Sequence, residues 1–206
     1  EDFYDKTFEF PAGFMTEYKP SELTTDTAHQ DLAKGYEIGK RFKSAKVSRI
    51  SDTNPLQLGH LHEADGRWRI YVFGDDKAQT DAANKANSFG EWLGTNANSP
   101  VIKYTREGED LNSVFDAKVI YQQPKEEIEL LETPQIFRPT VGPLQLTDLN
   151  NVFGVLTDDN IFGTFEISRA GAVVVVRPDG YISTVQPLDA TDAIAEFFDG
   201  VFTPQH

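Results

Sequence analysis

The sequence predicts an α/β fold in which a mixed β-sheet is flanked by helices. Two runs, 68–73 and 172–176, are short and rich in β-branched and aromatic residues, as buried strands are. Between them, residues 80–93 place apolar side chains at three- and four-residue spacing, which predicts a helix with one apolar face. The chain has 206 residues, of which 39% are hydrophobic, and this is enough for one packed core.

The remaining elements follow from turn signals between apolar runs. Residues 47–50 and 56–58 predict a small antiparallel hairpin, and 68–73 predicts a central strand that ends at Gly74. Further strands are expected at 101–105 and 117–121, and a hairpin is expected where 172–176 turns back into 181–185. Asp189 or Thr191 can cap a closing helix. Strand, helix, strand, hairpin and closing helix is the order of a thioredoxin-like α/β domain.

Two segments lack a regular pattern. Residues 1–37 mix aromatic side chains with proline and glycine, so we interpret them as an extended arm or linker that precedes a thioredoxin-like dimerisation domain at 38–206. Phe3, Phe8 and Phe14 in this arm are candidate contacts between subunits, because that many exposed rings would form an unusually large apolar patch. Four prolines between 124 and 143 predict a Pro-rich excursion over the surface that ends near residue 162.

The charge excludes several classes of partner. Against 33 acidic residues the chain has 19 basic ones, and the formal charge of -14 repels nucleic acid and anionic membranes. Basic clusters at 40–43 and 67–69 have acidic neighbours, so we interpret them as a solvated face or intramolecular ion pairs rather than an anion site. No run approaches the roughly 18 apolar residues of a membrane span, and we expect a cytoplasmic protein.

The residues for metal or thiol chemistry are sparse. The chain has no cysteine, which excludes disulfides, thiolate ligands and thiol redox catalysis. His60 and His62 could supply two zinc ligands, but no third ligand is evident, and we interpret them as solvated loop histidines. Asp75 and Asp76 follow the central strand, where a helix-capping role is favoured over a Mg²⁺ site. We therefore predict no metal site.

Ordered strings along the whole chain carry a family resemblance. Three of them are Ile38-Gly39-Lys40-Arg41-Phe42, the run from Asp65 to Phe73, and Val173-Val174-Val175-Val176-Arg177-Pro178-Asp179. With these strings the chain resembles the C-terminal thioredoxin-like dimerisation domain of FAD-dependent phenol 2-monooxygenases and 3-hydroxybenzoate 4-monooxygenases. These are oxidoreductases that act on aromatic compounds.

The resemblance implies a homodimer and places flavin and substrate in preceding domains. The chain has no Gly-x-Gly-x-x-Gly after a strand, so we expect FAD and NADPH only in a full-length parent. The loop at 74–79 also lacks the Cys-x-x-Cys of an active thioredoxin, and no proline precedes the strand at 173. We therefore predict a non-catalytic assembly domain, with no catalytic residue, that pairs through its arm or an exposed sheet edge.

A second hypothesis stays open beside this one. The chain could be a fragment of a longer hydroxylase, or a free-standing thioredoxin-like protein that binds or transforms an aromatic or polyketide-like small molecule. For the free-standing protein, His60, Tyr71 and Asp75 are the candidate pocket residues. A plain interaction module without a ligand is a third possibility.

Overall fold

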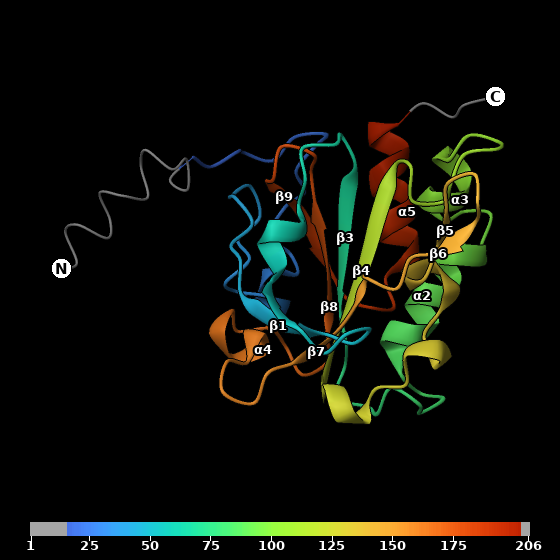
Figure 1. The fold of residues 1–206 in the computed structure, drawn as a ribbon. Coiled ribbons are helices and arrows are strands. Elements are labelled where there is room, and N and C mark those ends of the chain that lie inside the picture. The colour runs from blue at the N-terminus through green and yellow to red at the C-terminus, as the bar shows by residue number, and fades with distance from the viewer. Residues whose placement is uncertain (1–15, 203–206) are drawn as a thin grey trace.

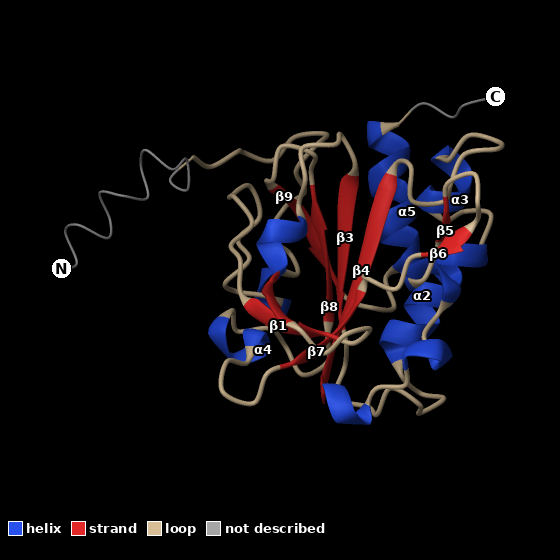
Figure 2. Ribbon diagram, in the orientation of Figure 1, coloured by secondary structure: helices blue, strands red, loops and turns tan. Residues whose placement is uncertain are grey.

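The structure is a computed structural model that describes residues 16–202. A seven-stranded mixed sheet lies at its centre, with helices on both faces (Figures 1 and 2). The strands occur in the spatial order β2-β1-β7-β4-β3-β8-β9. Their bounds are β1 Lys46–Arg49, β2 Pro55–Gln57, β3 Trp68–Phe73, β4 Phe115–Pro124, β7 Val152–Val155, β8 Ala172–Val176 and β9 Ile182–Gln186.

The central pairing matches the predicted order. β3 pairs in parallel with β4 and antiparallel with β8, and β8 turns back to pair with β9. The helices α2 (Lys85–Thr95) and α3 (Pro100–Tyr104) connect β3 to β4, and α5 (Thr191–Val201) closes the chain. This is a thioredoxin-like α/β arrangement. The predicted hairpin of β1 and β2 is confirmed, with Val47 opposite Leu56.

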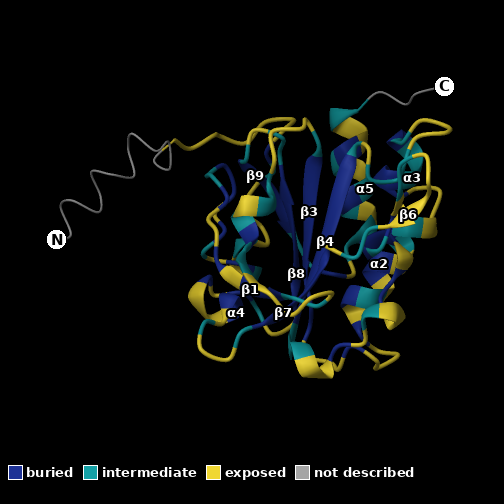
Figure 3. Cartoon of the chain, viewed as in Figure 1, coloured by how far each residue is buried: buried dark blue, intermediate teal, exposed yellow. Residues whose placement is uncertain are grey.

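The sheet separates two apolar cores, and β3 is buried along its whole length (Figure 3). Successive side chains of a strand point to opposite faces. Trp68, Ile70 and Val72 accordingly pack with α2, α3 and α5, whereas Tyr71 and Phe73 pack on the other face. That second core is covered by α4 (Ile161–Thr164) and by the N-terminal segment that includes the short 3₁₀ helix Gln30–Leu32.

The strand predicted at 101–105 is wrong, because residues 101–104 belong to α3. The Ser99 hydroxyl accepts a hydrogen bond from the Val101 amide at 3.2 Å, and Pro100 occupies the first turn, where its missing N–H costs nothing. Val101 and Tyr104 then pack on the core. β-Branched residues suggested a strand, but the helix start signal before them decided the structure.

The boundaries of the other two helices differ from prediction. α2 begins at Lys85 instead of residue 80, because the Asn84 side chain accepts from the Asn87 amide at 2.9 Å. α5 has Ala190 at its N-cap, without a side-chain hydrogen bond, so the cap predicted from Asp189 or Thr191 is wrong. Asp189 instead lies 2.9 Å from the Lys85 ammonium.

The Pro-rich excursion is confirmed only for its first part. It contains 3₁₀ turns at Lys125–Glu127, Leu130–Glu132 and Gln135–Phe137, and then a two-stranded hairpin of β5 (Thr140–Val141) and β6 (Leu146–Thr147). The chain next enters the main sheet as β7, which is buried and pairs with β4 and β1. The excursion therefore does not extend to residue 162 as predicted.

The ring cluster between α5 and the sheet provides a test of the core. Phe198 is fully buried, and its ring lies edge-on to Trp68 at 5.4 Å and to Phe115 at 5.0 Å. We expect Phe198→Ala to lower the free energy of unfolding by about 3–5 kcal/mol, because it leaves a cavity among these rings. Chemical denaturation monitored by tryptophan fluorescence measures this loss. Glu196→Ala on the exposed side of α5 is the control, and an equal effect of both variants would contradict the packing.

Candidate functional site

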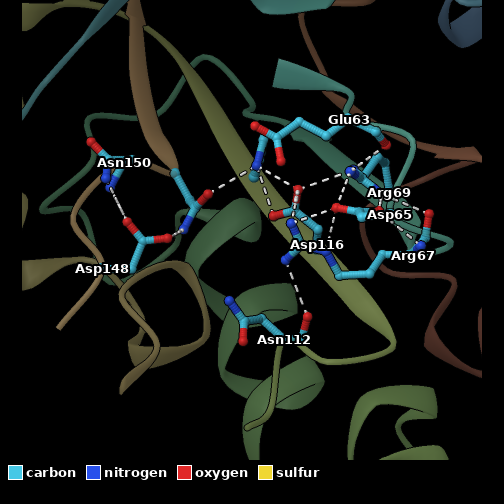
Figure 4. A network of polar contacts seen from close by, with 10 residues as sticks. Glu63, Asp65, Arg67, Arg69, Asn112, Asp116, Asp148 and Asn150 are labelled. Atoms are coloured by element: carbon cyan, nitrogen blue, oxygen red, sulfur yellow. Dashed lines mark hydrogen bonds and ion pairs between the residues drawn. The ribbon is translucent and has the colours of Figure 1, made fainter. Parts of the chain in front are cut away.

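A charged cluster with a buried centre, the Arg69 network, joins β3, β4 and the loops before β3 and β7 (Figure 4). Its members are Asp65, Arg67, Arg69, Asp116, Lys118, Asp148 and Asn151. Arg69 is fully buried, and its Nη1 and Nη2 each donate to the Asp65 carboxylate at 2.8 Å. The Nη atoms also donate to the carbonyls of Arg67 and Glu63. The Arg69 Nε lies 3.0 Å from Asp116 Oδ2 without hydrogen-bond alignment, so that contact is an ion pair.

Lys118 extends the network toward β7. Its ammonium donates to both oxygens of Asp116 at 2.7 Å and to Oδ1 of Asn151 at 2.9 Å. Asn151 in turn donates to Asp148 at 3.0 Å. Burial lowers the pKa of Lys118, and the Asp116 carboxylate counteracts part of this effect. Each charge is thus compensated, and removal of one partner would leave the others buried and unpaired.

The network holds the loop before β3 against the sheet. Arg67 lies 2.8 Å from Asp65, and its Nη1 donates to the carbonyl of Asn112 at 3.2 Å. Burial alone would raise the pKa of Asp65, but the hydrogen bonds from Arg69 and Arg67 outweigh it and hold that pKa well below its usual value. For the basic cluster at 67–69, the predicted intramolecular ion pairs are confirmed.

A cavity of about 430 Å³ opens beside this loop. One wall of the cavity is the turn 178–180, which follows the end of β8. Because Val176 at that end pairs with Arg69, the cavity lies near the start of β3. His60 and His62 both border it. Burial lowers the pKa of His62, and the charge of Arg69 adds to this effect. The lining residues are Arg41, Phe42, Ser44, Gly59, His60, His62, Ala64, Pro178, Asp179 and Gly180.

The structure does not bring the three candidate pocket residues together. Tyr71 lies in the core, where its ring stacks on Phe42 at 4.5 Å and burial raises the pKa of its hydroxyl. Asp75 lies beyond the opposite end of β3, where its carboxylate accepts from the Lys85 amide at 3.0 Å and thereby satisfies the first N–H of α2. Only His60 borders the cavity.

Two strongly exposed apolar side chains lie on the β5–β6 hairpin, and a third, Leu131 at 72% exposed, lies on the 3₁₀ turn Leu130–Glu132 instead. Leu144 is 80% exposed and Leu146 62% exposed, and the hairpin lies on the side of the molecule that carries α2, α3 and α5 (Figure 1). Its backbone is held in place, since the Gly142 amide donates to Asp110 at 2.7 Å. The hairpin therefore presents two solvent-facing leucines on a fixed backbone.

The edges of the main sheet offer less to a partner. The outer side of β9 is covered by the chain's own backbone, with hydrogen bonds of 2.9 Å from Gly39 to Ile182 and from Thr25 to Ser183. The other edge, β2, is three residues long and begins with Pro55, which has no N–H to donate. Phe3, Phe8 and Phe14 lie outside the described residues.

The described part of the chain contains neither a cluster of metal ligands nor a membrane-spanning helix. Within residues 16–202, no group of three histidine, aspartate or glutamate side chains is placed to hold a metal ion. Over the same range, no helix is long and apolar enough to cross a membrane.

His60 and His62 lie in and directly after a 3₁₀ turn, Leu58–Leu61, and not on a strand.

Comparison with known proteins identifies the family. Residues 16–206 match the family described as phenol hydroxylase, C-terminal dimerisation domain. The match covers nearly the whole chain. The chain belongs to this family.

Curated relatives of this dimerisation domain are monooxygenases. It is 39% identical over 203 residues to a 3-hydroxybenzoate 4-monooxygenase of Comamonas testosteroni, which covers 96% of the chain and 32% of the relative. It is 30% identical over 200 residues to the FAD-dependent monooxygenase terD of Aspergillus terreus, covering 92% of the chain and 32% of the relative. The chain thus spans about a third of the length of these relatives.

Solved structures of low sequence similarity also match the dimerisation domain. A thiol:disulfide interchange protein from Bacteroides sp. matches with a TM-score of 0.46 and 12% identity, over 77% of this chain and 88% of that one. Yeast Sco1 matches with a TM-score of 0.44 and 12% identity, over 80% and 97%.

Sequence reasoning missed most of the Arg69 network and the exposed leucines. One signal was present, because Lys118 lies among apolar residues inside the predicted strand 117–121, and such a charge requires a buried partner. The register that places Asp116 opposite Arg69 is a tertiary feature. Leu144 and Leu146 fell in a segment without a regular pattern.

We expect Asp116→Ala to destabilise the dimerisation domain by about 3–5 kcal/mol, because Arg69 and Lys118 would lose their shared buried carboxylate. Urea unfolding measures the effect. Asp158→Ala removes the same charge from an exposed loop and should change stability by less than about 0.5 kcal/mol. Similar losses in the two variants would show that the network adds nothing specific.

Proposed function

We propose that the chain is the self-associating C-terminal domain of a flavin-dependent aromatic hydroxylase and performs no catalysis itself. Membership of the dimerisation-domain family and similarity to monooxygenases support this proposal. Because the chain corresponds to 32% of each relative's length, FAD, NADPH and a phenolic substrate would be held by the remainder of a longer polypeptide.

The described residues support an assembly role more than a catalytic one. The sequence has no cysteine, so thiol–disulfide exchange has no nucleophile in this chain. His60 and Asp75 lie toward opposite ends of β3, and the Tyr71 hydroxyl is enclosed by the core. These three side chains cannot act on one small molecule, which argues against the free-standing enzyme.

The exposure of Leu144 and Leu146 is the observation that carries the proposal. Burial of a leucine side chain contributes about 1.5–3 kcal/mol, and the same hairpin from two copies can meet across a two-fold axis. The mostly polar neighbours Gln145 and Thr147 would form a rim around an apolar centre, as in other subunit interfaces. We infer that this hairpin is the self-association surface.

Sedimentation velocity tests the proposal. We expect the 206-residue chain to sediment with a mass near twice 23.0 kDa at micromolar concentration. The double variant Leu144→Ser/Leu146→Ser should weaken dimerisation by at least about tenfold in Kd, because it removes the apolar centre of the interface. Leu23→Ser is the matched control, since Leu23 is exposed beside β9 and away from the hairpin.

The outcomes distinguish whether the chain self-associates from where its interface lies. A monomer at all accessible concentrations would contradict self-association of this chain. A dimer that resists the hairpin substitutions would place the interface elsewhere, and the triple change of Phe3, Phe8 and Phe14 to Ser would then test the N-terminal arm.

A further inference from the structure

The cavity of about 430 Å³ is built by three segments that are distant in sequence. They are residues 41–44, the loop 59–64 that the Arg69 network holds in place, and the turn 178–180 between β8 and β9. An antiparallel bridge between Arg41 and Tyr181 and a hydrogen bond of 2.9 Å from Phe42 to Gly180 fix the first segment to the third. The walls are therefore held by backbone pairing and buried charges.

Arg41 is the unusual residue of this cavity. Its side chain is half-buried, and no hydrogen bond or ion pair joins its guanidinium to another residue within 16–202. Its Nε is buried without an acceptor, and the guanidinium lies 5.3 Å from the centroid of the Tyr181 ring. A half-buried guanidinium without acceptors is costly, so an external acceptor would stabilise it.

The neighbouring arginines contrast with Arg41, because each has a carboxylate. Arg177, in the turn beside the cavity, pairs closely with Asp179, and Arg69 pairs with Asp65 and Asp116. Among residues 16–202, Asp179 is the one carboxylate in the cavity wall, and it is engaged, since it also accepts from the Tyr181 amide at 3.4 Å. It therefore leaves the charge of Arg41 available to a ligand.

The rest of the wall suits an organic body. Phe42, Ala64 and Pro178 are its apolar lining residues, and His60 and Ser44 are polar ones, with the Ser44 hydroxyl already donating to Gln57. A volume of about 430 Å³ lies within the usual range for sites that bind small molecules. The planar guanidinium of Arg41, oriented by the Tyr181 ring, matches a carboxylate or phosphate in a two-bond geometry.

We propose that this cavity binds a small organic molecule through its oxyanion group, with Arg41 as the residue that holds the anion. The apolar wall at Phe42 and Pro178 contacts the body of the molecule. Carboxylates and phosphate esters share the required chemistry. The site is separate from the exposed hairpin of β5 and β6, so ligand binding and self-association can succeed or fail independently.

Titration of the 206-residue chain with benzoate, phenyl phosphate and benzamide tests the proposal by NMR. Benzamide has the shape of benzoate without its charge. We expect benzoate or phenyl phosphate to shift the amide signals of Gly59, His60 and Gly180, and benzamide to bind at least about tenfold more weakly. The preferred one of the two anions identifies the oxyanion class. Absence of saturable shifts with both anions would overturn the proposal.

Two variants assign the site to Arg41. Arg41→Gln should weaken anion binding by at least about tenfold, whereas Arg106→Gln, which removes an exposed charge outside the cavity wall, should leave it unchanged. Arg41→Lys keeps the charge and the aliphatic stem, so it should fold and bind the anion several-fold more weakly. Unchanged binding in Arg41→Lys together with a folded, fully binding Arg41→Gln would overturn the proposal. If Arg41→Gln unfolds, Arg41→Lys decides alone: several-fold weaker anion binding supports the proposal, and unchanged binding overturns it.

Discussion

The parallel pairing of β3 with β4 places Arg69 beside Asp116, and much of the molecule depends on this buried contact. Two charged side chains in the middle of a sheet are tolerable only with full sets of partners. Asp65 accepts hydrogen bonds from Arg69, and Asn151 accepts one from Lys118, which pairs with Asp116. These contacts fix the positions of the loops before β3 and before β7. The charges are unfavourable to bury, but their pairing fixes the loops at one end of the sheet.

This constraint links the core to both proposed surfaces. The loop held by Asp65 continues back into residues 59–64, which form a wall of the Arg41 cavity. On the opposite face, Arg67 contacts the carbonyl of Asn112 close to Asp110, which holds the Leu144 hairpin through Gly142. A ligand surface and an association surface thus rest on neighbouring parts of one charged framework.

Elements whose structure is set by local residue composition were predictable from the sequence. Residues 68–73 and 172–176 are apolar and β-branched enough to be strands in almost any context, and both predictions are confirmed. The run 101–105 has the same character, yet Ser99 and Pro100 start a helix there, because capping outweighs a weak strand preference. β7 is four residues long and follows an irregular segment. Its sequence therefore did not distinguish a buried strand from a continuation of the surface excursion.

The sites were less predictable because they depend on contacts between distant segments. Arg41 follows Lys40 and precedes Lys43 in a short basic run, and only the fold reveals that it lines a cavity whose carboxylate, Asp179, pairs with Arg177. An exposed leucine such as Leu144 likewise cannot be told from a buried one by sequence alone. Whether a side chain is free to meet a partner is a property of the folded surface.

Thiol labelling of a single cysteine placed on the hairpin measures self-association at that surface most directly, since the natural sequence contains no cysteine. Thr147→Cys leaves Leu144 and Leu146 in place, and Ala170→Cys in the exposed loop before β8 is the reference. If the hairpin forms the interface, maleimide labelling of Cys at position 147 slows as protein concentration rises through the dimer Kd, while labelling at 170 stays constant. Labelling at 147 that does not depend on concentration, in a chain that sediments as a dimer, would contradict the hairpin interface.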